Sequence, residues 1–524
     1  MQLACRRNDR EKAAHARGET PRRSALPPTL LVVRSENGQT GSAVVATTQG
    51  VTLDADTCYR ALTSRDGRFD GVFFVGVETT GVYCRPICPA RTPGRGRCVF
   101  FARAAEAERA GFRACFRCRP ELAPGLASVD KVSRLAARAA ELIDAGYLNE
   151  HSVEELAKLL NVTARHLRRC LESELGVAPV ELAQTRRLAM AKQLLADSRL
   201  PLTQVAFASG FSSVRRFNSA VRERFGRAAS ELRSETGTSG DGIPLRLDYR
   251  PPFDFERSLA FLRARAIPGV ERVSDGEYTR SVVVDGKVGV VSVRHHSRRA
   301  ALVAQVSPSL APKLMFVAQR LRALFDLNAR PEQIARHLSR DRRLAPLVKR
   351  YPGLRIVGAF SGYETAVRVI LGQQVSVAAA TTLSGRLLER FGTESEVGRV
   401  FPEPLVLAKA SARQVRAVGV TEARAKTLVE LSRAVAEGRI DLTAGEPTTL
   451  VQELLAVPGI GPWSAHAITL RALCWPDAFP SGDLALRRAL GVDSARAAEV
   501  RAEGWAPWRA YAAMLLWRAS AEGR

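Results

Sequence analysis

The chain has 524 residues, of which 46% are hydrophobic, so it is long enough for three or four domains with cores of their own. It contains 78 Lys and Arg residues against 53 Asp and Glu residues, and the formal net charge of +25 favours a polyanionic partner, DNA or RNA first. A coding bias toward arginine would give the same composition, so charge alone does not identify the partner. No apolar run approaches the roughly 18 residues that a membrane span needs, and we expect a cytoplasmic protein without a membrane span.

Residues 1–46 are polar, charged and rich in small side chains. A segment of this composition cannot bury enough apolar surface to fold by itself. We therefore expect a disordered tail or a misassigned start here, followed by a first domain over residues 47–126.

Four cysteines in this first domain have the spacing of metal ligands. They form one C-x3-C pair and one C-x2-C pair with 26 residues between the pairs, namely Cys84, Cys88, Cys115 and Cys118. Each pair can close a tight chelate around one metal, and four thiolates suit tetrahedral Zn2+. Disulfides are disfavoured because nothing marks the chain as secreted. On spacing alone, a purely structural zinc site is the expectation, since most all-cysteine zinc sites are structural.

The segments around both pairs, residues 79–88 (TTGVYCRPIC) and 110–120 (AGFRACFRCRP), change that expectation. They resemble the zinc domain of Ada-type DNA methylphosphotriester repair proteins, in a match from about residue 56 to residue 120. The resemblance implies that Cys84 irreversibly accepts a methyl group from a methylphosphotriester while the other three cysteines remain zinc ligands. It also makes Arg85 and Arg91 candidate phosphate contacts. Methylation removes one negative charge, so we expect tighter DNA binding and a switch to transcription activation, with RNA polymerase as a further partner.

Residues 127–236 are predicted to be helical throughout, with two helix-turn-helix units at residues 152–169 and 202–217. Ser152 and Ser212 are placed to cap helices. The second helix of each unit carries arginines opposite its apolar face, as a helix in a DNA major groove requires. The candidate DNA contacts are Arg165, Arg168, Arg215 and Arg216. The paired units resemble the AraC-type DNA-binding domain; the alternative is a plain helical bundle with a solvated basic face.

A Gly- and Ser-rich linker is expected at residues 237–244. Short β-like runs at residues 281–284 and 288–293, with helical stretches on either side, then predict an α+β subdomain over residues 245–327. From residue 328 to residue 524 we expect helices only, separated by Pro and Gly.

Residues 454–465 (LLAVPGIGPWSA) read as a helix, a tight glycine turn and a second helix. Gly459 and Gly461 let backbone N–H groups come close to a phosphate, and the second helix offers its positive N-terminus. This is a helix-hairpin-helix, which binds the DNA backbone without reading sequence. Asp483, downstream, begins another helix, where a lone Asp is most often only an N-cap.

The hairpin and the downstream Asp together resemble the helix-hairpin-helix DNA glycosylases, and more narrowly the AlkA-type alkylpurine glycosylases over residues 251–517. The segments on which this resemblance rests are residues 251–254 (PPFD), 370–376 (ILGQQVS) and 507–512 (PWRAYA). The resemblance implies that Asp483 is catalytic, that Trp463 and Trp517 line the base pocket, and that Gln374 stands where an intercalating wedge is often Leu. Without the resemblance, core packing is an equally good explanation of Trp463.

Trp463 stands where bifunctional relatives carry a Schiff-base lysine, so we expect removal of alkylated bases from double-stranded DNA without strand cleavage. The predicted fold is multidomain and mainly α: a small α+β zinc domain, an all-α double helix-turn-helix, an α+β subdomain and an all-α helix-hairpin-helix domain. The first alternative is a non-enzymatic DNA-binding regulator with structural zinc and an inactive glycosylase-like domain. The second is a glycosylase whose zinc domain is purely structural.

Overall fold

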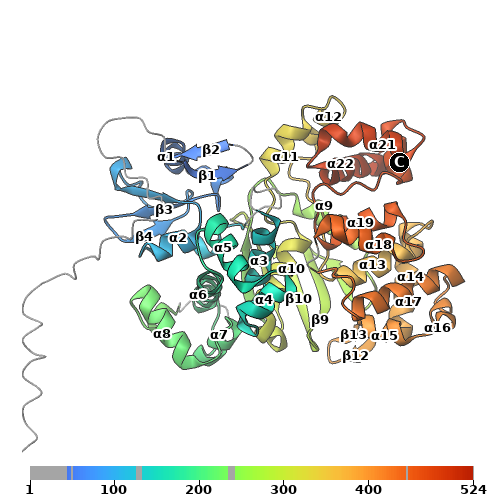
Figure 1. Cartoon of the computed structure of the whole chain (residues 1–524), viewed down its shortest axis with the longest axis horizontal. Helices are drawn as coiled ribbons and strands as arrows, with labels where there is room; N and C mark the ends of the chain where they lie inside the picture. Colours follow the sequence, from blue (N-terminus) through green and yellow to red (C-terminus); the bar gives the residue numbers. More distant parts are fainter. Residues whose placement is uncertain (1–43, 49–50, 126–132, 234–241, 444–445, 523–524) are drawn as a thin grey trace, which may run out of the picture.

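The computed structural model describes residues 44–48, 51–125, 133–233, 242–443 and 446–522 (Figure 1). We call residues 44–233 the N-terminal half and residues 242–522 the C-terminal half. The described part of the chain is mainly helical with four β-sheets, as the sequence predicts. The predicted tail lies outside the described residues except at its end, where the prediction is wrong. Residues 44–46 belong to strand β1 (Val44–Thr48), which pairs antiparallel with β2 (Val51–Asp54).

The first domain is a small α+β unit built on a four-stranded sheet of order β5-β3-β4-β6. The strands are β3 (Phe74–Val77), β4 (Val82–Cys84), β5 (Cys98–Phe101) and β6 (Arg113–Ala114). Two helices pack beside them, α1 (Ala55–Thr63) and α2 (Ala104–Arg109). The β4 and β6 strands run parallel, with Tyr83 opposite Ala114, and this pairing brings the two cysteine pairs to one end of the sheet.

The next domain is all helical over the described residues 133–233, apart from short loops. It comprises α3 (Arg134–Asp144), α4 (Val153–Leu159), α5 (Ala164–Leu175), α6 (Pro179–Asp197), α7 (Leu202–Ala208) and α8 (Val214–Phe225). The α4–α5 and α7–α8 pairs are the two predicted helix-turn-helix units, joined by the long helix α6. Ser152 caps α4 as predicted, whereas Ser213, and not Ser212, caps α8 by accepting from the backbone N–H of Arg216.

The C-terminal half begins with a five-stranded antiparallel sheet of order β7-β11-β10-β9-β8. The strands are β7 (Ile243–Asp248), β8 (Glu271–Ser274), β9 (Glu277–Val284), β10 (Lys287–His295) and β11 (Ala301–Val306). Two helices accompany them, α9 (Phe255–Arg263) and α10 (Leu314–Leu324). Since β7 starts at Ile243, the end of the predicted linker is part of an edge strand.

Helices form most of the remaining chain, in two packed groups with separate cores. The first group comprises α13 (Gly362–Leu371), α14 (Val377–Phe391), α15 (Pro404–Lys409), α16 (Ala412–Arg416), α17 (Glu422–Ala436), α18 (Pro447–Leu455) and α19 (Pro462–Ala472). The second comprises α11 (Pro331–Leu338), α12 (Leu344–Arg350), α20 (Leu484–Leu490), α21 (Ala495–Ala502) and α22 (Arg509–Glu522).

The expectation of helices only after residue 328 is wrong at one place. Strands β12 (Thr393–Ser395) and β13 (Gly398–Val400) form a short hairpin directly after α14. The turn needs a left-handed residue, and Gly398 with φ of 97° supplies it. A hairpin this short has too few residues for a visible alternation of apolar and polar side chains.

One hydrophobic core joins the two halves. It includes Phe74 and Tyr83 of the first domain, Leu194 of α6, and Leu245 and Leu302 of the C-terminal sheet. In Figure 1 the five-stranded sheet and α10 accordingly lie between the helix-turn-helix units and the helical groups of the C-terminal half. The two halves are therefore packed directly against each other.

A buried ion network fastens the sheet to α13, and it yields a stability prediction. The Arg280 guanidinium on β9 pairs with Glu364 at 2.6 Å, and Arg368 pairs with Glu271 at 2.8 Å. In Glu364→Gln, the buried Arg280 keeps only the more distant Glu271 carboxylate, at 3.9 Å, so we expect the free energy of unfolding to fall by roughly 3 kcal/mol. Chemical unfolding followed by tryptophan fluorescence measures it, since all five tryptophans lie in residues 463–517. Glu437→Gln, which breaks an exposed pair with Arg439, should leave the free energy of unfolding unchanged.

Candidate functional sites

The four predicted cysteine ligands come together in the structure. Their sulfur atoms all lie within 4.8 Å of one another, and all four residues are buried. Cys84 ends β4 and Cys115 directly follows β6, so the parallel pairing of these strands positions one cysteine of each pair. The backbone N–H of Cys115 donates to the carbonyl of Tyr83 at 3.0 Å and fixes the second pair against the first.

The chemistry of this cluster suits a divalent cation. Hydrogen bonds with the neighbouring cysteines, Cys115 first, raise the pKa of the Cys84 thiol well above its usual range, because four thiols this close cannot all ionise unaided. A tetrahedral zinc ion with bonds of about 2.3 Å would hold the sulfur atoms about 3.8 Å apart, which agrees with the observed clustering. The four side chains therefore fit zinc in number, type and separation.

The four sulfur atoms differ in their backbone hydrogen bonds. The backbone N–H of Arg85 donates to Cys118 Sγ at 3.3 Å. Over the part of the chain that the structure describes, no backbone N–H donates to Cys84 Sγ. An N–H donor draws electron density from a thiolate, so Cys84 keeps more of its nucleophilicity than Cys118 does.

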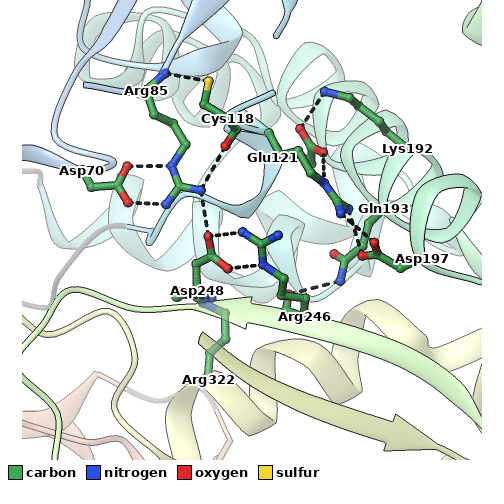
Figure 2. Close-up of polar contacts among 11 residues, drawn as sticks. Asp70, Arg85, Cys118, Glu121, Lys192, Gln193, Asp197, Arg246, Asp248 and Arg322 are labelled. Carbon is green, nitrogen blue, oxygen red and sulfur yellow. Dashed lines mark hydrogen bonds and ion pairs between the residues drawn. The ribbon is translucent and has the colours of Figure 1, made fainter. Parts of the chain in front are cut away.

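The prediction that Arg85 contacts a DNA phosphate does not fit its position. Its side chain is only 3% exposed and pairs with Asp70 and, at 2.7 Å, with Asp248 of β7 (Figure 2). It also donates to the carbonyl of Cys118 at 3.2 Å. Two buried carboxylates compensate its charge, so the side chain turns inward. Arg91, the other candidate of this domain, is exposed, and its contact with phosphate stays a prediction.

The predicted arginines of the helix-turn-helix units all lie on the surface: Arg165 and Arg168 on α5, Arg215 and Arg216 on α8. The opposite faces of these helices are buried, with Leu167 on α5 and Phe217 on α8 fully enclosed. This separation of faces satisfies the steric requirement for groove binding. Which arginines touch DNA stays a prediction.

The predicted helix-hairpin-helix is formed by α18 and α19. Gly459 has φ of 90°, and a Cβ there would lie 2.1 Å from Thr427 Oγ1, so only glycine fits. Thr427 in turn donates to the carbonyl of Pro458 at 2.8 Å and holds the turn. Gly461 caps α19, and no neighbouring atom lies within 4 Å of its Cβ position, so the helix N-terminus is open to a ligand.

The loop that carries Gln374 lies beside this hairpin. Gln374 is exposed, with φ of 58°. Its neighbour Gln373 donates from Nε2 to the carbonyl of Gly459 and to Ser464 Oγ, both at 3.0 Å. Arg424 donates to the Gln373 carbonyl at 2.7 Å. The wedge candidate and the hairpin thus form one surface, and the sequence reading missed the residues that join them.

Asp483, Trp463 and Trp517 meet where α19, α20 and α22 converge. Asp483 caps α20, and its Oδ1 accepts from the backbone N–H groups of Ala485 and Leu486, each at 3.0 Å. Both tryptophans donate from Nε1 to this carboxylate, Trp463 at 3.2 Å and Trp517 at 3.0 Å. Four N–H groups therefore orient the carboxylate, which is half-buried.

The sequence reading assigned the two tryptophans to the pocket wall and missed their hydrogen bonds. No sequence signal reveals them, because Trp463 and Trp517 lie 20 and 34 positions from Asp483 and the bonds depend on how three helices pack. With their N–H edges on the carboxylate, both indoles leave their ring faces for other contacts.

Among the described helices, none is both long and apolar enough to cross a membrane.

Comparison with known protein families places four family models along the chain. They are the metal binding domain of Ada over residues 57–121, a helix-turn-helix domain over 156–235, the AlkA N-terminal domain over 244–361, and the HhH-GPD superfamily of base excision DNA repair proteins over 367–509. Each model covers one of the sites described above or the sheet between them.

Three curated relatives show how these parts combine. A probable bifunctional transcriptional activator/DNA repair enzyme AlkA of Mycobacterium tuberculosis is 40% identical over 485 residues, which cover 88% of this chain and 96% of the relative. DNA-3-methyladenine glycosylase 2 of Escherichia coli is 35% identical over 52% of this chain and 95% of its own length. The bifunctional transcriptional activator/DNA repair enzyme Ada of Escherichia coli is 31% identical over 34% of this chain and 49% of its own length.

The match to the mycobacterial relative covers 88% of this chain and therefore runs through both halves. The chain therefore belongs to the family of bifunctional transcriptional activator/DNA repair enzymes that join an Ada-type N-terminal half to an AlkA-type C-terminal half.

Proposed function

We propose that the C-terminal half is a monofunctional DNA-3-methyladenine glycosylase. We also propose that the N-terminal half is a zinc-dependent methylphosphotriester acceptor that regulates transcription. The observation that carries the first proposal is the Asp483 carboxylate, held by a helix N-terminus and by two indole N–H groups beside a helix-hairpin-helix. A residue that only capped α20 would have no need of the two tryptophans.

The open N-terminus of α19 and the turn at Gly459 bind a DNA phosphate, with the Gln374 loop beside them. The target base must leave the stack before its glycosidic bond can be reached. An N-alkylated purine carries positive charge, and its attraction to an indole face contributes roughly 0.5–2 kcal/mol. The faces of Trp463 and Trp517 therefore favour alkylated purines over normal, uncharged ones.

Asp483 then stabilises the positive charge that develops on the sugar as the glycosidic bond breaks. The bonding electrons leave with the base, which becomes neutral. A water oxygen bonds to the sugar C1′, and its proton passes to the carboxylate or to solvent. Trp463 occupies the place of an amine nucleophile, so no Schiff base forms and the DNA strand stays intact.

In the N-terminal half, Cys84 is the proposed methyl acceptor. Zinc, when bound by the four cysteines, would keep their sulfurs ionised at neutral pH. Cys84 Sγ attacks the methyl carbon of a methylphosphotriester, forming an S–C bond, and the C–O bond breaks to release a phosphodiester anion. Among the described residues a backbone N–H donates to Cys118 Sγ and none to Cys84 Sγ, which favours Cys84 over Cys118 as the acceptor.

Methylation can reach the DNA-binding helices because the cysteine loop touches α8. Phe116, between Cys115 and Cys118, packs on Phe225 at the end of α8, with ring centroids 6.2 Å apart. Loss of one negative charge here reduces repulsion of DNA phosphates and strengthens binding. RNA polymerase is the proposed partner of the DNA-bound protein.

The first test concerns Asp483. Asp483→Asn keeps the cap but removes the negative charge, so we expect release of 3-methyladenine and 7-methylguanine from alkylated DNA to fall at least about 100-fold with DNA affinity retained. Chromatography of free bases measures release, and Asp493→Asn, at an exposed neighbouring Asp, should behave as the parent. No release by either protein would leave the non-enzymatic regulator as the better account, whereas equal release by both would show that Asp483 takes no part in the chemistry.

The second test separates the two roles of the tryptophans. Trp463→Phe and Trp517→Phe keep an aromatic face but remove the N–H donor to Asp483. A charge-assisted hydrogen bond contributes roughly 1.5–3 kcal/mol, so we expect base release to slow by about tenfold or more in each variant. Single-turnover kinetics measure this, with Trp475→Phe, which stacks on His466 instead, as the control. Unchanged rates would indicate that both tryptophans only pack in the core.

The third test concerns Cys84. Incubation of the zinc-loaded protein with methylphosphotriester DNA should add one CH2 equivalent, about 14 Da, to the peptide that contains Cys84. Peptide mass spectrometry measures it. Cys58, whose thiol pKa burial raises to about 12, should stay unmodified and serves as the internal control. A zinc-loaded protein that never gains this mass would have a structural zinc domain only.

A further inference from the structure

Arg85 connects the four-cysteine centre to the C-terminal sheet through a single side chain. Its backbone follows Cys84 and donates to Cys118 Sγ, so both cysteine pairs touch it. Its guanidinium lies in the interface between the halves, between Asp70 of the zinc domain and Asp248 at the end of β7. Asp248 also accepts from Arg246 at 2.7 Å (Figure 2). Two arginines and two carboxylates thus pair with one another, and all but the partly exposed Arg246 are buried.

Helix α6 makes a second connection between the cysteine loop and β7. Lys192 donates to the carbonyl of Cys115 at 3.0 Å and pairs with Glu121 at 2.9 Å, with both side chains buried. The next residue, Gln193, donates to the carbonyl of Arg246 on β7 at 3.1 Å. Consecutive residues of one rigid helix therefore hold the cysteine loop on one side and the edge strand on the other.

Arg250 extends the contact from β7 to the helical part of the C-terminal half. It is fully buried and donates to the carbonyls of Asp70 and Gly125 in the N-terminal half, at 2.8 and 3.0 Å. It also donates to the carbonyl of Asn328, just before α11, at 2.8 Å. Its own carbonyl accepts from Arg355 at 2.6 Å. A displacement of β7 would therefore be felt in the helical groups that carry Asp483.

Because β7 is an edge strand, its order depends on this connection. The strand is hydrogen-bonded to β11 on one side only, and on its other side it faces Arg85 and α6. Without a metal, four crowded thiols hold the cysteine loops poorly, and Arg85 loses its fixed backbone. Asp248 then keeps Arg246 but loses the more deeply buried Arg85, a change that destabilises because the buried charge is less well compensated.

We propose that the four-cysteine centre and the C-terminal half form one cooperative unit, coupled through Arg85, Asp248 and α6, so that metal occupancy of the centre controls the order of β7 and the stability of the C-terminal half. The proposal rests on zinc binding by the four cysteines and needs neither methyl transfer nor base excision. It assigns the zinc domain a second role, as a support of the repair domain that follows it.

The test uses the full-length, zinc-loaded protein before and after removal of the metal by a chelator. Thermal unfolding followed by tryptophan fluorescence reports on the C-terminal half, because all five tryptophans lie in residues 463–517. We expect chelation to lower this midpoint by about 3 °C or more and to speed amide exchange in residues 243–248. In Asp248→Asn the link is already broken, so chelation should shift the midpoint by less than half as much.

Glu332→Gln is the matched control, because it breaks the exposed pair between Arg68 and Glu332, which also crosses between the halves. It should keep the full effect of chelation. Amide exchange in the parent needs no variant and decides the matter even if Asp248→Asn fails to fold. Bound zinc whose removal changes neither the fluorescence midpoint nor the exchange of β7 would overturn the coupling alone. A protein that binds no zinc would overturn the metal centre and the coupling together.

Discussion

The structure depends on the compensation of arginines that are buried between its parts. A guanidinium cannot lose its proton in a protein, so each buried one must find carboxylates or carbonyls. Arg85, Arg250 and Arg355 obtain theirs from segments far apart in the sequence: Asp248, Asp70 and the backbone around Arg250. Because Arg85 and Arg250 find acceptors in the other half of the chain, the need to satisfy these two cations fixes how the halves pack.

The same requirement explains how an isolated carboxylate can be both structural and chemical. Asp483 caps α20 with one oxygen, and that bond is local to the helix. The indole N–H groups of Trp463 and Trp517 come from two other helices, so the direction of the carboxylate is set by tertiary packing. A cap alone would leave the other oxygen free to rotate with solvent. Trp463 donates to that other oxygen and Trp517 to the capping oxygen, so together they remove this freedom and preorganise the charge where a reacting sugar is expected.

The sequence predicts what depends on short spacing. The cysteine cluster follows from two chelating pairs, and the helix-turn-helix units follow from helical periodicity with caps such as Ser152. It predicts badly what depends on distant partners. The sequence predicts a surface cation at Arg85, because its buried partners Asp70 and Asp248 lie 15 and 163 positions away in the chain. Likewise, the link from Gln373 to Gly459 spans 86 positions and has no local signal.

The packing of the two halves also affects which positively charged groups can reach DNA. In the interface, the charges of Arg85 and Arg246 are cancelled by Asp70 and Asp248, so this cluster contributes nothing to the excess. Surface groups such as Arg165 and Arg215 carry the part of the excess that can approach phosphates. When two DNA-binding sites are joined by a flexible linker, linker length sets the effective concentration of the second site. Here the two halves share a core, so their fixed relative orientation takes the place of linker length. One DNA molecule can then engage both halves only if its path, straight or bent, matches that orientation.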